Sequence, residues 1–485
     1  MRIIGLAMNN LIWKLTTLLI SFCFLLVSTG VFSQETETEE ESAPPERNLA
    51  ADTGYAALGI ITSNIFLNLG ARFGDQPYAN TTFKSMKNNI VHWRWFWEDA
   101  DRFMVNQFGH AYQGSTYFAS ARVNGFSFYE SIVFLPLGSI MWEAFLEPDP
   151  SINDNISTTM GGTVMGEMLY RLFLEVDSSS SVLALIGGFL VNPISSFNKI
   201  YNRPPRATGG GNIYNLSVRS GVEKSFAFFS GSKEEENSWK YPGGHVNVKV
   251  VYGNPFVQHS KTPFEHFELY AGFTTNFDTY NAAVVSDGYL YSFSLVHTDT
   301  TSVSTGLNMH FDFFDVTNSV VDNAGYGNIQ FCSSAVGWAV KHKYRLSEKS
   351  YLENKAHAAA ILWGNSMYNA DDESAMVWDT AFGNTRGTYG MGENIKLFFT
   401  FFHEKAGELE IAAHGYHVFA IPVNKRHSTG SVLFLNCSLS YDFPLGKIIG
   451  IGTKGTFWGL LGLYNSADNV NRYVVSNCLY VRFSF

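Results

Sequence analysis

One histidine and three carboxylates in the first half of the chain are the residues best suited to chemistry. They are His110, Glu143, Asp154 and Glu167, carried by the segments NQFGHAYQG, MWEAF, SINDN and VMGEM. A histidine can exchange a proton near neutral pH, and a carboxylate bound to its second ring nitrogen orients the ring and tunes its pKa. We therefore take these four residues as candidate catalytic residues.

Two other interpretations of the same residues stay open. One histidine and two carboxylates could hold a divalent metal ion. Alternatively, the polar groups could simply bond to one another where helices pack. The intervals between the four residues follow no local motif, and no Gly-rich phosphate loop precedes a helix. We therefore expect no cofactor, and the sequence alone assigns no metal.

Short helices must position these residues. Residues 51–207 form a helical region in which small residues recur one turn apart, as at Gly162 and Gly166, so that helix backbones can approach closely. Asp154 is the expected N-cap of one helix. Apolar runs such as 181–193 stop well short of the roughly 20 residues that span a membrane. We expect no membrane-spanning helix after the N-terminal signal.

From residue 208 to residue 485 the hydrophobic period changes to two. In SVLFLNCSLSYDF, for example, Leu433, Leu435 and Leu439 alternate with polar residues such as Asn436 and Ser440. About twelve segments of this kind follow one another, and bacterial outer-membrane barrels have an even number of strands. We predict a mainly β fold: a transmembrane antiparallel β-barrel of about 12 strands with an N-terminal helical region. A soluble two-sheet sandwich is the alternative.

The two ends of the chain indicate where the protein resides. Residues 1–33 resemble a signal peptide cleaved before Gln34, with a signal anchor as the alternative, and residues 34–50 form a disordered acidic linker. The last strand ends on Phe485, as is typical of bacterial outer-membrane proteins. We expect a Gram-negative outer-membrane location, with membrane lipid and the barrel-assembly machinery as partners, the latter through the Phe485 strand. The net charge of −10 argues against a nucleic-acid partner.

Several polar residues of the strand region share a strand face and are candidate lumen-lining residues. They are His310, Asp312, Glu408, Glu410, His414 and Tyr416. Solvated or hydrogen-bonded side chains are the default for a barrel lumen. A selective binding site is the more specific alternative.

The helical region also resembles a known family. The order N-x3-H-x3-G-x2-Y, AR-x-NG, WE, ND, GG-x3-GE and NP, followed by VGWAVKHKYRL at 336–346 and RGTYGMGENIK at 386–396, is similar to an uncharacterised bacterial family, the domain of unknown function DUF3943. The resemblance implies a match over most of the mature chain. It implies an envelope location and no mechanism.

Three functions remain open from the sequence. The first is an envelope channel, or a barrel that binds or transports a small amphipathic molecule, with the helices as a plug or a periplasmic cap. The second is an outer-membrane lipid-modifying enzyme that uses His110 with Glu143, Asp154 or Glu167. The third is a structural or surface-interaction barrel. The residues leave open whether the protein is an enzyme.

Overall fold

The computed structural model describes most of the chain in two compact units. The described residues are 48–99, 101–177, 182–200, 211–229, 242–256, 262–276, 279–319, 329–367, 387–422, 429–465 and 469–485. The helices up to Asn212 form one unit, and the strands from Ile213 form the other. The predicted signal peptide and nearly all of the acidic linker lie outside the described residues. Whether the helices plug or cap the barrel stays a prediction.

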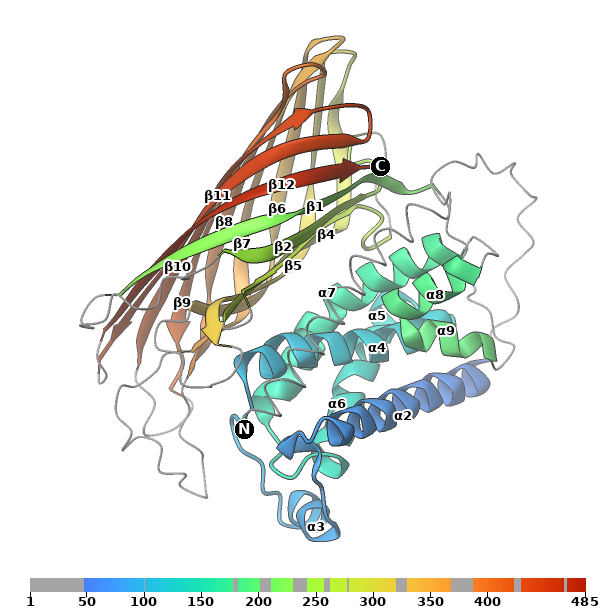
Figure 1. Cartoon of the computed structure of the whole chain (residues 1–485). Helices are drawn as coiled ribbons and strands as arrows, with labels where there is room; N and C mark the ends of the chain where they lie inside the picture. Colours follow the sequence, from blue (N-terminus) through green and yellow to red (C-terminus); the bar gives the residue numbers. More distant parts are fainter. Residues whose placement is uncertain are drawn as a thin grey trace. The chain divides into compact units, whose positions relative to one another are not determined.

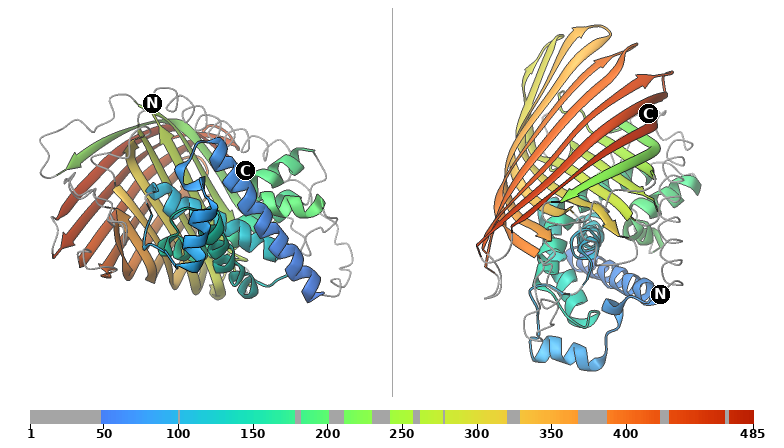
Figure 2. Two further views of the ribbon diagram at one scale, coloured as in Figure 1. Left: turned by 90° about the horizontal axis from the view of Figure 1, so that it is seen from below. Right: turned by 60° about the vertical axis from the view of Figure 1, so that its left-hand side comes forward.

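The strand unit is a closed antiparallel barrel of twelve strands (Figure 1). Each strand pairs with its neighbours in sequence, and β1 pairs with β12 to close the cylinder. The strands are tilted as they wind round it (Figure 2). Their bounds are β1 Ile213–Phe229, β2 Gly243–Tyr252, β3 Phe267–Thr275, β4 Thr279–His297, β5 Thr301–Ser319, β6 Ile329–Ser347, β7 Ser350–Met367, β8 Gly387–His403, β9 Gly407–Ala420, β10 Gly430–Pro444, β11 Ile449–Tyr464 and β12 Val470–Ser484. The predicted fold class and strand number are confirmed.

The C-terminal strand closes the barrel, as its sequence predicts. Phe485 and Leu216 exchange two backbone hydrogen bonds of 2.8 and 3.2 Å at the end of the β1–β12 ladder. Along β12, Leu479 is exposed on the outer face while Cys478 and Tyr480 are buried on the inner face. Closure leaves no unpaired strand edge, which is what a barrel in lipid requires.

The outer face of the barrel is apolar. On β10 the side chains mostly alternate between exposed apolar residues and buried ones, with Cys437 and Ser438 half-buried in the middle of the strand. The strand therefore has one apolar outer face and one inward face. The exposed outer residues of this strand are Leu433, Leu435, Leu439, Tyr441 and Phe443. Ile449, Ile451 and Leu463 continue the apolar surface on β11. A closed barrel with lipid-compatible residues outside and polar residues inside is a transmembrane barrel of the bacterial outer membrane.

The connections differ at the two ends of the barrel. At the end where β12 finishes, β6 and β7 are joined by a tight turn at residues 348–349, and β8 and β9 by residues 404–406. At the opposite end, the β7–β8 connection takes up residues 368–386. In outer-membrane barrels the short turns face the periplasm and the longer loops face outward. By this pattern the chain enters and leaves the barrel on the periplasmic side.

The helical unit is a bundle built around α4 and α7 (Figure 1). Its elements are α2 Leu49–Phe73, the 3₁₀ turn η1 Pro77–Ala79, α3 Phe83–Val91, the π-helical segment η2 Met104–Gly109, α4 His110–Val123, α5 Phe128–Ile132, α6 Phe134–Phe145, α7 Ile152–Asp177, α8 Val182–Val191 and α9 Pro193–Ile200. These helices lie within the predicted helical region.

Helix α2 buries several polar residues and exposes several large apolar ones. Asn64 donates to the carbonyl of Gly138 at 3.2 Å, and Asn68 donates to the carbonyl of Leu146 at 3.0 Å. The exposed residues of the helix include Leu58, Ile61, Ile65, Phe66 and Leu69. By length and composition alone, α2 could cross a membrane. Within its most apolar stretch, 33% of the residues are buried. The expectation that no membrane-spanning helix follows the signal therefore stays a prediction.

Helices α4 and α7 cross at glycine, as the small-residue pattern predicts. A Cβ on Gly114 would lie 2.1 Å from the carbonyl oxygen of Thr158, and one on Gly162 would lie 2.7 Å from the Cα of Gly114. These contacts are between backbones, so neither helix can yield without moving as a whole. The glycines therefore set the distance between the two helices that carry His110 and Asp154.

A Gly114→Ala substitution should destabilise the helical unit by about 1–3 kcal/mol, because overpacking forces the backbones apart. The matched control is Gly70→Ala on α2, where an added Cβ meets nothing within 4 Å. That substitution should raise stability slightly, since alanine favours the helix by up to about 1 kcal/mol. Denaturant unfolding followed by helical circular dichroism measures both. Equal effects of the two substitutions would contradict the close crossing.

Candidate functional site

His110 lies at the junction of the π-helical segment and α4. π-Helical turns are rare and occur frequently at functional sites. The side chain is buried, with Nδ1 3.3 Å from Thr158 Oγ1 and Nε2 3.7 Å from Asp154 Oδ2. The ring is thus held between two residues of α7, with one nitrogen directed to a hydroxyl and the other to a carboxylate.

The end of α6 brings two further carboxylates to His110. Glu143 and Glu147 are one turn apart and essentially inaccessible to solvent. Glu143 Oε2 accepts the backbone N–H of Ser151 at 2.8 Å, and Glu147 Oε2 accepts the indole N–H of Trp142 at 2.6 Å. One ligand atom from each of His110, Glu143 and Glu147 can be chosen so that all three lie within 4.8 Å of one another.

Asp154 lies in the first turn of α7 rather than at its N-cap, so the predicted cap is wrong. The Asp154 N–H reaches the hydroxyl of Ser151 at 3.3 Å, which is the contact that a capping serine makes. The Asp154 carboxylate is thereby free for another role. Oδ1 accepts from Asn153 at 3.1 Å, while Oδ2 faces His110.

Two aspartates before the π-helical segment also join this cluster. Asp99, Asp101 and Glu147 form a second group of carboxylates within 4.8 Å. Asp99 Oδ1 is fixed by the Asp101 N–H at 2.9 Å and by Asn106 at 2.7 Å. The sequence-based prediction did not include Asp99, Asp101 or Glu147. The spacing of Glu143 and Glu147 on one helix face was the available signal for Glu147.

Burial and like charges dominate the electrostatics of the cluster. Burial lowers the pKa of His110 to about 4, so its imidazole is neutral at pH 7. Burial raises the pKa values of Glu143, Glu147 and Asp154 well above their ordinary range, and neighbouring carboxylates raise them further. Burial, then the charge of Asp99, raises the pKa of Asp101 to about 8. Several acids therefore share a site that disfavours their ionised forms.

Glu167, the fourth candidate, is engaged elsewhere in the helical unit. Its carboxylate accepts from Arg122 Nε at 2.7 Å and from Arg171 Nε at 2.9 Å. The structure thus brings His110, Glu143 and Asp154 together, whereas Glu167 bonds two half-buried arginines, of which Arg122 joins α4 to α7. This arrangement favours a structural role for Glu167.

The barrel lumen contains a second set of polar groups, arranged as ion pairs across the cylinder. These pairs join strands that are not neighbours in the sheet, so they can meet only across the lumen. The pairs are Arg219–Asp442 at 2.8 Å, Lys341–Glu268 at 2.6 Å, Lys355–Asp287 at 2.7 Å, Lys396–Asp312 at 2.7 Å, and Lys249–Glu410.

Five of the six predicted lumen residues belong to this polar layer, and Tyr416 reaches it only through its hydroxyl. Asp312 accepts from Lys396 and from the Tyr416 hydroxyl at 3.1 Å. Glu410 pairs with Lys249, and Glu408 lies 3.8 Å from Arg482. The remaining two are His310, which bonds Asn308 at 3.1 Å, and His414, which is buried.

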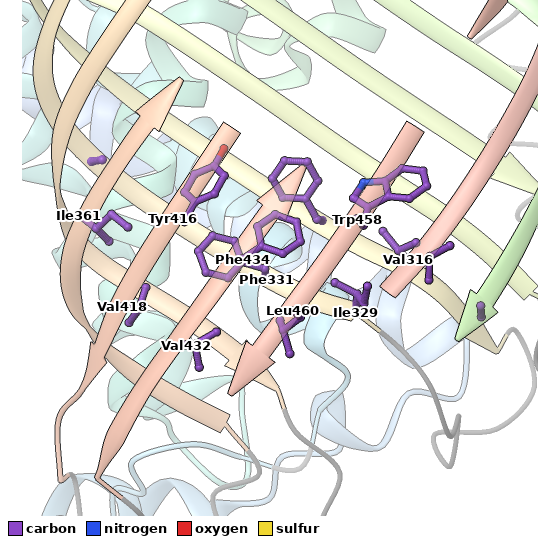
Figure 3. Close-up of a cluster of buried hydrophobic side chains, with 14 of the residues drawn as sticks. Val316, Ile329, Phe331, Ile361, Tyr416, Val418, Val432, Phe434, Trp458 and Leu460 are labelled. Atoms are coloured by element: carbon purple, nitrogen blue, oxygen red, sulfur yellow. The ribbon is translucent and has the colours of Figure 1, made fainter. Parts of the chain in front are cut away.

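An apolar layer fills the lumen toward the long-connection end (Figure 3). Phe331 of β6 stacks on Phe434 of β10 with ring centroids 4.6 Å apart, although these strands are on different sides of the cylinder. Tyr416 and Trp458 belong to the same buried cluster. The sequence predicted a polar lumen. This layer was missed because VLF at 432–434 in β10 and FF at 313–314 in β5 are apolar on both strand faces.

A cavity of about 100 Å³ lies where the two layers meet. Its polar side includes Glu223, His245, Lys249 and Lys454. Its apolar side includes Phe314, Val316, Phe398 and Trp458. The lumen therefore offers an amphipathic chamber, narrower than the roughly 300–1,000 Å³ of ordinary ligand pockets.

Comparison with known protein families finds a match within the helical unit. Residues 93–194 match the family described as a domain of unknown function, DUF3943. The match covers the helical region and not most of the mature chain, so the predicted extent was wrong. No curated protein matches the chain in sequence.

Solved outer-membrane proteins show a distant likeness. The CymD monoaromatic hydrocarbon channel shares 12% identity over 56% of this chain and 88% of its own, with a TM-score of 0.21. The NanC porin shares 13% identity over 54% and 98%, with a TM-score of 0.25. A FadL homologue of Pseudomonas aeruginosa shares 9% identity over 56% and 90%, with a TM-score of 0.23. These scores are too low to support a functional argument. Residues 93–194 thus resemble the DUF3943 family, and a twelve-stranded outer-membrane barrel follows them in the chain.

Proposed function

We propose that the barrel binds a small amphipathic molecule in its lumen and passes it across the outer membrane. The chamber between the apolar layer and the ion pairs is the observation that carries this proposal. An apolar part of the ligand would lie against Phe314 and Trp458, and its polar end would face Lys249, Glu410 and Lys454. Such a chamber favours an amphiphile over a sugar or a purely apolar compound.

The ion pairs keep the chamber narrow in the conformation described. Lys396 and Asp312 are both fully buried, and Lys355 bonds both Asp287 and Glu268. A ligand of ordinary size must displace some of these side chains, so the barrel works as a gated binding chamber rather than an open pore. The charged side has both signs and sets no preference for anion or cation.

Binding of octanoate, octylamine or octanol tests whether the lumen chamber accepts an amphipathic ligand. Added to the protein in nanodiscs, at least one should change the tryptophan fluorescence saturably, because Trp458 lines the cavity. Trp458→Phe should remove most of that change. Ala412→Phe, which fills the chamber, should abolish binding measured by calorimetry. A response that persists unchanged in Ala412→Phe would place binding elsewhere and contradict the proposal.

Catalysis by the helical unit is the second candidate, and the 3.7 Å approach of His110 to Asp154 favours it. It ranks second because both side chains are buried, so a lipid would need the bundle to open. A His110→Ala strain with a normally folded barrel should then show the same altered lipid profile as a deletion strain. An unchanged profile in the deletion strain would remove this candidate.

A further inference from the structure

The helical unit contains a buried set of ligand atoms that the barrel proposal does not use. We infer that His110, Glu143 and Glu147 hold a divalent first-row transition-metal ion, with Asp154 beside them. The ligands come from α4, from α6 and from the residues just after α6, so one ion would tie these elements together. The inference concerns the DUF3943 domain and does not depend on what the barrel binds.

The distances suit a common ion. Ligand atoms of His110, Glu143 and Glu147 lie within 4.8 Å of one another. Metal–nitrogen and metal–oxygen bonds of about 2.0–2.2 Å place two ligands of one ion at most about 4.4 Å apart. Small side-chain rotations therefore complete the site, and no backbone movement is needed.

Each acid of the site has one oxygen fixed by a donor, and two of the acids have a second oxygen with no hydrogen-bond partner. Glu143 is anchored through Oε2 by Ser151, and Asp154 through Oδ1 by Asn153. Among the described residues, Glu143 Oε1 and Asp154 Oδ2 have no hydrogen-bond partner although both are buried. Buried oxygens without donors are costly. An anchored carboxylate with one free oxygen is the arrangement that outer-shell donors produce around a metal.

The His110 ring, like the carboxylates, is held through one of its two polar atoms and leaves the other free to bind. Thr158 contacts Nδ1, which directs Nε2 toward the carboxylates. The ring is buried, and a neutral imidazole is the form that binds a metal. A hydrogen-bonded ring nitrogen opposite the ligating one is the usual feature of metal-bound histidine.

The charge of the cluster also calls for a cation. In the described part of the chain, no Lys or Arg forms an ion pair with Glu143, Glu147 or Asp154, whereas Glu167 has two arginines. Imidazole with carboxylates suits Mn²⁺, Fe²⁺ and Zn²⁺. Ca²⁺ and Mg²⁺ prefer oxygen ligands alone. Protons shared among the acids are the competing explanation, and they would leave no ion to detect.

Metal retention by the full-length protein tests the inference. Protein extracted in mild detergent is stripped with EDTA, incubated with Mn²⁺ or Zn²⁺, desalted and analysed by elemental mass spectrometry. The wild type should retain about one ion per chain and gain a higher unfolding midpoint of the helical unit. Mn²⁺ bound to the protein should also lose the spectrum of the free aqueous ion in electron paramagnetic resonance.

Two isosteric variants separate a metal site from a merely structural cluster. Glu143→Gln should retain no ion, yet without metal it should unfold at a higher temperature than the stripped wild type, because the variant lacks a buried acid that must either carry a like charge or take up a proton. Glu167→Gln should unfold at a lower temperature, because Arg122 and Arg171 lose their partner, and it should retain the ion. Absence of retained metal in the wild type, or equal retention in Glu143→Gln, would overturn the inference.

Discussion

Replacing Lys396 with methionine should destabilise the barrel by about 3–5 kcal/mol, the usual effect of removing one partner of a buried ion pair. Lys396 and Asp312 are both 0% exposed, and their closest atoms are 2.7 Å apart. Without the ammonium, the Asp312 carboxylate would keep the Tyr416 hydroxyl but lose its only cationic partner among the described residues. Urea unfolding of the barrel in lipid vesicles, followed by heat-modifiable migration in gel electrophoresis, measures the loss.

The double variant Asp312→Asn with Lys396→Met provides the control. It removes both charges together, and a buried pair replaced by neutral groups of similar size is often neutral in stability. Most of the stability lost in Lys396→Met should therefore return. If the two substitutions instead add their costs, the pair does not interact, and the polar layer described for the lumen is incorrect.

Leu439→Arg should destabilise the membrane-inserted barrel by about 2–4 kcal/mol, the range for arginine on the lipid face near the bilayer midplane. Leu439 is 53% exposed and lies within the outer apolar row of β10. In a soluble sandwich this face would be covered by a second sheet. Here only hydrocarbon is available to it, so a guanidinium must either drag water inward or distort the strand.

Ser438→Arg is the matched control for Leu439→Arg. Ser438 is the adjacent residue on the opposite face and lines the lumen chamber near Glu410. An arginine there would meet polar and charged side chains, so its effect should be clearly smaller. Folding into vesicles of defined lipid measures both variants. A larger effect for Ser438→Arg would mean that the faces of β10 are assigned the wrong way round.

The sequence by itself determined the barrel and its place in the membrane. The two-residue period of a strand and the face of each side chain depend only on residues nearby in sequence. Leu433, Leu435 and Leu439 therefore alternate with inward-facing residues regardless of how distant parts of the chain fold. The even number of such segments is also what a closed outer-membrane barrel requires. These features follow from neighbouring residues because a lipid-facing strand presents its whole outer face to a uniform solvent.

Only the tertiary structure decided what lies inside. Phe434 is next to lipid-facing residues on an apolar stretch, and its contact with Phe331 depends on how far strands are staggered around the cylinder. The lumen ion pairs join residues as distant as Lys249 and Glu410 for the same reason. A two-residue period assigns faces, but it does not say which side chains meet across a closed sheet.

In the helical site, too, the sequence predicted the types of residue and the tertiary structure decided which of them meet. Sequence singled out His110, Glu143 and Asp154 as residue types suited to one site, and gave no ground to separate them from Glu167. The separation comes from the close α4–α7 crossing at Gly114, which places Asp154 at His110 and Glu167 beside Arg122. Residue chemistry is encoded one position at a time, whereas the distances that make a site arise only when helices pack.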